Sequence, residues 1–145
     1  MPKFSLFSIR ASLLYLVIGG SVGGIMLVSK AIGVWPWIWY WRTAHIHAML
    51  VGWLLNLIFG VAFWILPRLD AHGWRGSPWL VWSASGLLQA ALAVLVWASI
   101  WPWSAAIAIA SSLECLAAIA IAWHCWPRLQ PLIIEPRPAK TSKLD

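Results

Sequence analysis

The sequence predicts an all-α integral membrane protein, a bundle of four transmembrane helices with both termini in the cytoplasm. Composition is the first reason: 62% of the 145 residues are hydrophobic and 10% are charged, whereas soluble domains carry about 25% charged residues. The second is that the apolar residues gather into four runs, each long enough to cross a hydrocarbon core of about 30 Å. The third is the placement of basic and tryptophan residues at the ends of these runs.

The first predicted span covers residues 11–34 and follows a cytoplasmic N-terminal segment, residues 1–10. It contains two overlapping pairs of glycines with G-x-x-x-G spacing: Gly19 with Gly23, and Gly20 with Gly24. This spacing lets a neighbouring helix approach closely or leaves room for a flat ligand, and close helix packing is the interpretation that we prefer.

The second predicted span covers residues 44–66 and stops at Pro67, where a polar, breaker-rich loop begins. The third and fourth cover residues 79–101 and 104–126, and a tight Trp-Pro-Trp connection joins them. Together the four spans form one transmembrane domain, residues 11–126. Residues 127–145 are Pro-rich and charged, and we predict that they form a cytoplasmic tail.

Basic residues set the predicted orientation. The side that holds the N-terminus carries eight of them, and the other side carries two, Lys30 and Arg42. This bias follows the positive-inside rule and predicts a multi-pass protein of the inner membrane of a bacterium. Because the basic residues flank apolar runs, the net charge of +6 indicates contact with lipid headgroups rather than with nucleic acid.

One polar side chain lies near the midpoint of each predicted helix. These residues are Ser21, Asn56, Gln89 and Glu114. Because lipid offers no hydrogen-bond partner at that depth, we predict that the four face inward and bond to one another. A structural clasp is the preferred interpretation, and a proton relay is the alternative.

The second span opens with two histidines, His45 and His47. At 100° per residue, one helix face carries the polar and small residues and should look into the bundle. Its members are His45, Met49, Gly52, Asn56, Phe59 and Phe63. His47 points nearly the opposite way, so the two imidazoles diverge.

His45 and Arg42 suggest a b-type heme site. An imidazole inside the membrane can ligate the iron, and a guanidinium one turn further out can pair with the propionates at the water boundary. Met49 and Gly52 share the face of His45 and would be neighbouring cofactor contacts. His47 is the alternative iron ligand.

A resemblance supports this interpretation. The second span resembles helix two of heme-copper oxidase subunit I, in particular its nitric oxide reductase and C-type oxidase branch and short standalone proteins similar to it. The resemblance covers roughly residues 9–97 and is carried by Arg42-Thr43-Ala44-His45-Ile46-His47, Val51-Gly52-Trp53, Phe59-Gly60-Val61-Ala62 and Ile65-Leu66-Pro67-Arg68. It implies that His45 is an axial ligand of a low-spin heme and that Arg42 is the propionate partner.

The chain also departs from that family, whose members have about twelve helices and place their remaining ligands on later ones. The remaining histidines, His72 and His124, are predicted at the opposite face of the membrane, about 30 Å from His45. A complete oxidase site is therefore not expected, nor is enzyme activity of the chain alone. A homodimer or higher homo-oligomer that shares one heme between two copies of His45 would complete the coordination. Electron transfer, with a respiratory-chain partner, or binding of a diatomic gas would then be the function.

Two rival hypotheses remain open. The chain could be a cofactor-free structural or assembly subunit of a membrane respiratory complex. It could also be a copper-handling membrane protein that uses His45, His47 and Met49, since thioether and imidazole ligands suit copper.

Overall fold

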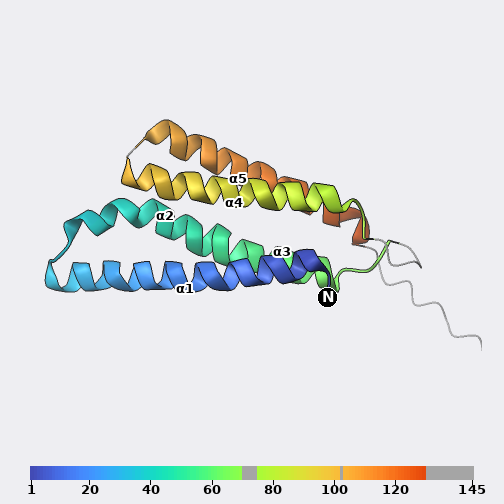
Figure 1. Cartoon of the computed structure of the whole chain (residues 1–145), viewed down its shortest axis with the longest axis horizontal. Helices are drawn as coiled ribbons and strands as arrows, with labels where there is room; N and C mark the ends of the chain where they lie inside the picture. The colour runs from blue at the N-terminus through green and yellow to red at the C-terminus, as the bar shows by residue number, and fades with distance from the viewer. Residues whose placement is uncertain (70–74, 102, 130–145) are drawn as a thin grey trace, which may run out of the picture.

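The computed structural model describes residues 1–69, 75–101 and 103–129, and in these residues every regular element is a helix. Four helices are long and apolar enough to cross a membrane: Lys3–Ile32, Pro36–Ile65, Pro78–Ile100 and Ser104–Arg128. They run up and down in turn, so the start of the first and the end of the fourth lie at the same end of the molecule (Figure 1). The described residues thus confirm the predicted all-α, four-helix architecture.

The first helix, α1 (Lys3–Ile32), begins well before the predicted start of the first span at residue 11. Two of the additional residues, Ser5 and Ser8, are fully buried, and Ser8 packs where a side chain on Gly60 would lie. The segment 1–10 was predicted to lie outside the bundle. Most of it instead belongs to α1 and packs inside the bundle. At the other end, Gly33 takes the left-handed conformation (φ 70°) and ends the helix.

The second long helix, Pro36–Ile65, is built from four consecutive elements. It begins with the 3₁₀ turn η1 (Pro36–Trp41), continues through α2 (Arg42–His47) and the π-helical η2 (Ala48–Leu55), and ends with α3 (Asn56–Ile65). The helix begins before residue 44, the predicted start of the second span, because Pro36 supplies a fixed φ suited to the first turn of a helix. The start at Pro36 places both histidines deeper along the helix than predicted.

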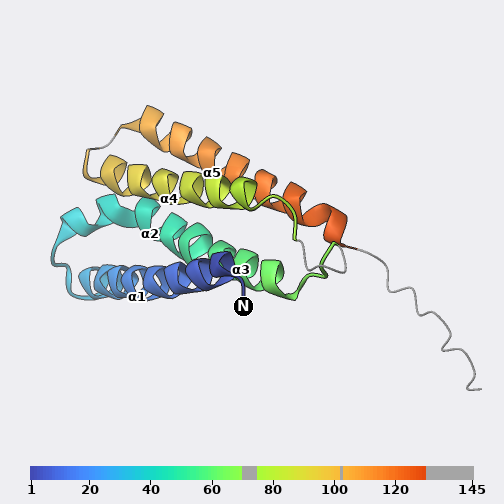
Figure 2. The same ribbon diagram turned by 45° about the vertical axis from the view of Figure 1, so that its right-hand side comes forward.

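The third and fourth helices are α4 (Pro78–Ile100) and α5 (Ser104–Cys125), the latter extended by the 3₁₀ turn η3 (Trp126–Arg128). They form a hairpin with an alanine-rich seam, in which Ala91, Ala98, Ala110 and Ala117 are fully buried. The first hairpin consists of α1 and the second long helix, and α4 packs against it (Figure 2). The predicted loop residues 70–74 and the tail from residue 130 lie outside the described residues.

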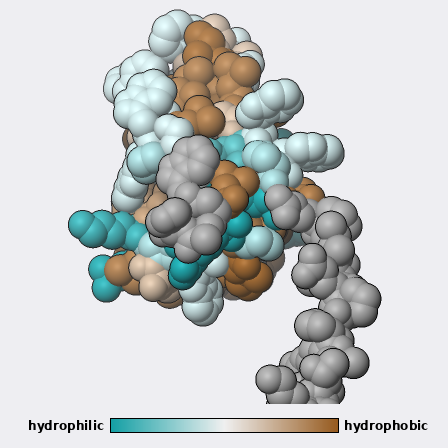
Figure 3. Space-filling model, turned by 90° about the vertical axis from the view of Figure 1, so that its right-hand side faces the viewer, coloured by the Kyte–Doolittle hydropathy of each residue, from teal (hydrophilic) through white to brown (hydrophobic). Residues whose placement is uncertain are grey.

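Arg128 joins the two hairpins at the end of the bundle where α1 begins. It is 1% exposed, and its guanidinium donates hydrogen bonds to the carbonyl oxygens of Phe63, Leu66 and Pro67 at 2.9, 2.7 and 2.9 Å. These carbonyls lie at the end of α3, where the helix leaves acceptors without partners. Figure 3 looks at this end, where hydrophilic side chains gather below the hydrophobic surface of the α4–α5 hairpin.

Candidate functional site

The imidazole of His45 lies in a notch that two glycines leave on α1. Its Nδ1 is 2.9 Å from the carbonyl oxygen of Gly19, and a Cβ added to Gly23 would lie 2.7 Å from its Cε1. Met49 fills the neighbouring space, because a Cβ on Gly19 would lie 2.7 Å from its Sδ. Gly19 and Gly23 therefore serve close helix packing, as preferred from the sequence.

The other glycine pair has a different environment. A Cβ on Gly20 or Gly24 would meet no atom within 4 Å among the described residues. Only one of the two predicted G-x-x-x-G pairs therefore contacts the second long helix. The helix face predicted at 100° per residue is also the face that packs on α1, since Gly52 contacts Tyr15 and Phe63 contacts Phe4.

The hydrogen bond to Gly19 determines the tautomer of a neutral His45. A carbonyl oxygen can only accept, so Nδ1 carries the proton and Nε2 carries the free lone pair. Metal-binding histidines commonly have this arrangement, in which one ring nitrogen donates to a carbonyl or carboxylate and the other binds the metal. His45 is chemically suited to bind iron through Nε2.

The space beside His45 is small. The cavity that it lines, together with Gly19 and Val96, has a volume of about 50 Å³, whereas ligand pockets usually measure about 300–1,000 Å³. Arg42 is exposed and lines a different, open cavity of about 320 Å³ with Ala98 and Ser99 of α4. The donor chemistry of His45 fits a heme, but the interior of one chain in this arrangement does not have room for a porphyrin.

A chain of polar side chains crosses the middle of the bundle. The hydroxyl of Tyr15 donates to Oε1 of Gln89 at 2.7 Å, and Nε2 of Gln89 donates to Oδ1 of Asn56 at 3.3 Å. Asn56 in turn donates to backbone carbonyls of the π-helical segment, at Val51 and Gly52. The predicted bond between Asn56 and Gln89 is confirmed, and Tyr15 is a member that the sequence interpretation missed.

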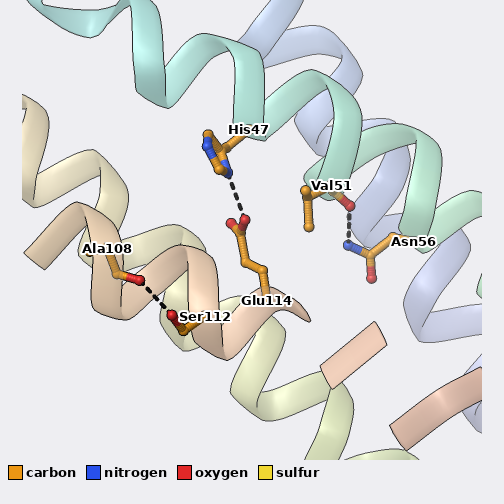
Figure 4. A network of polar contacts seen from close by, with 6 residues as sticks. All are labelled: His47, Val51, Asn56, Ala108, Ser112 and Glu114. Carbon is orange, nitrogen blue, oxygen red and sulfur yellow. Dashed lines mark hydrogen bonds and ion pairs between the residues drawn. The ribbon is translucent and has the colours of Figure 1, made fainter. Parts of the chain in front are cut away.

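Ser21 and Glu114 do not join this chain. Ser21 is exposed and donates to the carbonyl of Val17 in its own helix, so its predicted inward position is wrong. Glu114 pairs with His47 instead: its Oε2 lies 2.6 Å from Nδ1 of the imidazole (Figure 4). The four polar residues therefore do not form one cluster: Asn56 bonds to Gln89, Glu114 bonds to His47, and Ser21 bonds within its own helix.

The His47–Glu114 pair was missed for two reasons: the helical projection turned His47 away from the face that was expected to look into the bundle, and the second span was predicted to begin at residue 44. With that start, His47 would lie in the first turn, near the outer membrane boundary. The observed start at Pro36 moves His47 at least about 12 Å further along the helix, at 1.5 Å per residue. One general signal could have revealed the pair, because an ionisable group inside a membrane is usually matched by another.

The polar chain should contribute to stability through Gln89. Replacing Gln89 with leucine is expected to lower the free energy of unfolding by about 1 kcal/mol, since each interhelical hydrogen bond in a membrane contributes about 0.6 kcal/mol on average. SDS-driven unfolding in mixed micelles measures this change. Ser83→Ala is the control, because the Ser83 hydroxyl is exposed and bonds to its own helix. Equal stability of the two variants would contradict the claim that the hydrogen bonds of Gln89 stabilise the fold.

The structure does not bring the copper candidates together around one point. His45 and the Met49 sulfur both lie against Gly19 of α1, whereas His47 is directed away from them and bonds to Glu114 of α5. Among the described residues, no group of three or more His, Cys, Asp or Glu side chains is arranged to hold a metal ion. His124 has another role, since its Nε2 donates to the carbonyl of Arg75 at 3.0 Å, and His72 lies outside the described residues.

Comparisons of the chain with protein-family models, with curated proteins and with solved structures found no match.

Proposed function

We propose that this chain is a b-type heme protein of a bacterial inner membrane, similar to the first helices of heme-copper oxidase subunit I. Its function in this proposal is electron transfer or the binding of a diatomic gas. The supporting observation is the hydrogen bond between His45 Nδ1 and the Gly19 carbonyl, which leaves Nε2 of a neutral imidazole free to bind iron. The resemblance around Arg42 and His45 supports the same ligand.

In this proposal the heme binds at a contact between chains, because the cavity beside His45 holds about 50 Å³. A two-fold homodimer would supply one His45 from each copy to a shared heme. Bound heme would supply a one-electron redox centre. The chain would contribute the imidazole, the orientation of its ring through Gly19, and a guanidinium at Arg42 for the propionates.

The visible spectrum of the purified protein tests this proposal. We expect a Soret band, with a sharp α-band after reduction by dithionite, and a heme content of about one per two chains. His45→Ala should remove these bands, whereas the matched variant His47→Ala should keep them. Bands that survive in His45→Ala and disappear in His47→Ala would transfer the ligand role to His47.

A second candidate is a cofactor-free structural or assembly subunit. It is favoured by the close fit of the His45 ring against Gly23, which needs no further group to fill the notch. A protein purified from heme-replete cells without a Soret band would support this candidate and contradict the first. Metal analysis of the same sample tests the copper hypothesis, which requires a stoichiometric copper content.

The proposed topology places both termini in the cytoplasm, on the side that holds most of the basic residues. The four helices could each cross a membrane, and an even number of crossings returns the chain to its starting side. Reporter fusions test this: a cytoplasmic reporter should be active after residue 145 and inactive when inserted after Val34. The reverse result would invert the topology.

A further inference from the structure

Two guanidinium groups lie near each other at the end of the bundle where α1 begins. Arg128 belongs to η3, and Arg75 lies shortly before the start of α4. The charge of Arg75 is close enough to act on that of Arg128, which is 1% exposed. Like charges held away from water repel each other, and buried charges in proteins are normally paired with an opposite charge. This pair of arginines is therefore expected to share a counter-ion.

Each guanidinium has a buried nitrogen without a hydrogen-bond partner among the described residues. In Arg128, Nε and Nη2 donate to carbonyl oxygens at the end of α3, and the nitrogen without a partner is Nη1. In Arg75 it is Nε. A buried donor that makes no hydrogen bond costs free energy, and the cost is higher for a charged group. The two nitrogens therefore indicate a site for an anionic acceptor.

The acidic side chain that the structure describes lies far from these arginines. It is Glu114, which bonds to His47 and lies about four helical turns before Arg128, roughly 20 Å along the axis. Guanidinium groups recognise carboxylates and phosphates through their planar set of N–H donors. Two of them together suit a phosphate group, because it offers several oxygens that carry negative charge.

The segment that carries Arg75 is fixed against α5, the helix whose end carries Arg128. His124 donates from Nε2 to the carbonyl oxygen of Arg75 at 3.0 Å. Its ring also packs on Gly76, where an added Cβ would lie 2.7 Å from Cε1. Gly76 has a φ of 91°, a conformation that glycine adopts without strain. The backbone thus holds the two arginines near each other without any contribution from the side chain of Arg75.

Exposed tryptophans surround this end of the bundle. Trp79, Trp123 and Trp126 are 76%, 77% and 73% exposed, and tryptophan concentrates at the boundary between membrane and water. An open cavity of about 460 Å³ is lined by Trp123, Trp126 and Pro127, the residue before Arg128. Its volume is within the range of ligand pockets. In a membrane, the hydrophilic surface of this end (Figure 3) would lie at the depth of the lipid headgroups.

We propose that Arg75 and Arg128 form a binding site for a phosphate group. Its oxygens accept hydrogen bonds from Nε of Arg75 and Nη1 of Arg128 and neutralise the two charges. Both nitrogens are covered in the structure, so the side chain of Arg75 changes its rotamer as the phosphate enters, a change that is common on binding. The phosphate comes from an anionic lipid headgroup or from solution. Basic pockets between membrane helices bind such headgroups, and the proposal does not depend on heme binding.

Thermal unfolding of the full chain in detergent micelles tests the site and distinguishes the two sources of phosphate. The probes are dioleoylphosphatidylglycerol, dioleoylphosphatidylcholine and inorganic phosphate, all at one ionic strength. A ligand that binds only the folded state raises the melting temperature. We expect phosphatidylglycerol to raise it more than phosphatidylcholine, whose headgroup has no net charge. Stabilisation by inorganic phosphate but not by phosphatidylglycerol would assign the same site to a soluble phosphate.

Arg75→Gln removes one guanidinium but leaves the bonds of Arg128 to α3 in place. It should weaken binding of the stabilising probe about tenfold or more, the loss expected for one charge-assisted hydrogen bond. Arg68→Gln is the matched control, because Arg68 is exposed at the same end, and its affinity should stay within about twofold of the wild type. The proposal is wrong if the two variants bind equally well, or if neither phosphatidylglycerol nor inorganic phosphate stabilises the wild type.

Stability without any probe separates this site from an ion pair inside the chain. Arg75→Gln should then be at least as stable as the wild type, because it removes the repulsion between two like charges. Asp70, which lies outside the described residues, is the acidic residue nearest to Arg75 in the sequence. If Arg75→Gln and Asp70→Asn are both less stable than the wild type, a carboxylate of the chain neutralises the arginines, and the proposal fails.

Discussion

Replacing Arg128 with alanine is expected to lower the free energy of unfolding by about 3–5 kcal/mol. Hydrogen bonds to a charged group contribute about 1.5–3 kcal/mol each, and the three that Arg128 donates to the end of α3 are expected to contribute less than their sum because bonds from one guanidinium are not independent. The guanidinium also lies 4.9 Å from the centre of the Phe63 ring. Its removal leaves three carbonyls without this donor and separates the end of α5 from the second long helix. SDS-driven unfolding measures the loss.

Arg68→Ala is the matched control for this variant. It removes the same charge from the same end of the bundle, but Arg68 is exposed. Its effect should stay within about 0.5 kcal/mol, as for most surface substitutions. If both variants lose the same stability, the effect comes from the net charge at this end of the bundle and not from the bonds to α3.

Replacing Gly23 with alanine should destabilise the protein by about 1–3 kcal/mol, the usual cost of overpacking a filled site. The new methyl group would lie 2.7 Å from Cε1 of His45 and 3.2 Å from its Nε2. The imidazole would have to move, and its hydrogen bond to Gly19 would weaken. Unfolding in SDS reports the stability, and the ¹⁵N spectrum of His45 reports the displaced ring.

Gly24→Ala provides the control, because an added Cβ at Gly24 meets nothing within 4 Å among the described residues. It should be neutral or stabilising by about 0.5–1 kcal/mol, since alanine favours a helix more than glycine does. A Gly24→Ala variant as unstable as Gly23→Ala would indicate that a second chain packs on the outer glycine pair. In the heme proposal, Gly23→Ala should also alter the spectrum, because it moves the proposed iron ligand.

The four-helix architecture could be read from the sequence because it depends on properties that are local in the chain. Apolar runs of membrane-spanning length and the polar breaker-rich loop do not require knowledge of which helix meets which. The helix face that carries His45, Met49 and Gly52 could also be predicted from the sequence, because helical periodicity alone places these residues together. Spacing also predicted close packing at the glycines of α1, but it did not distinguish Gly19 and Gly23, which pack, from Gly20 and Gly24, which do not. The starts of the first two helices could not be located in the same way. Charged and serine residues interrupt the apolar pattern before residue 11, and a proline stands at residue 36.

Partners across the bundle were decided by the tertiary structure. Their positions near the midpoints of the predicted helices placed four polar residues at one depth, namely Ser21, Asn56, Gln89 and Glu114. Depth along a helix does not determine which way a side chain points. The rotation of each helix about its axis turns Ser21 outward and sends Glu114 to His47. Likewise, Arg128 lies next to the end of α3 only because the two hairpins pack together. Sequence periodicity determines which residues share a helix face, whereas contacts between helices depend on rotation and packing, which are properties of the whole assembly.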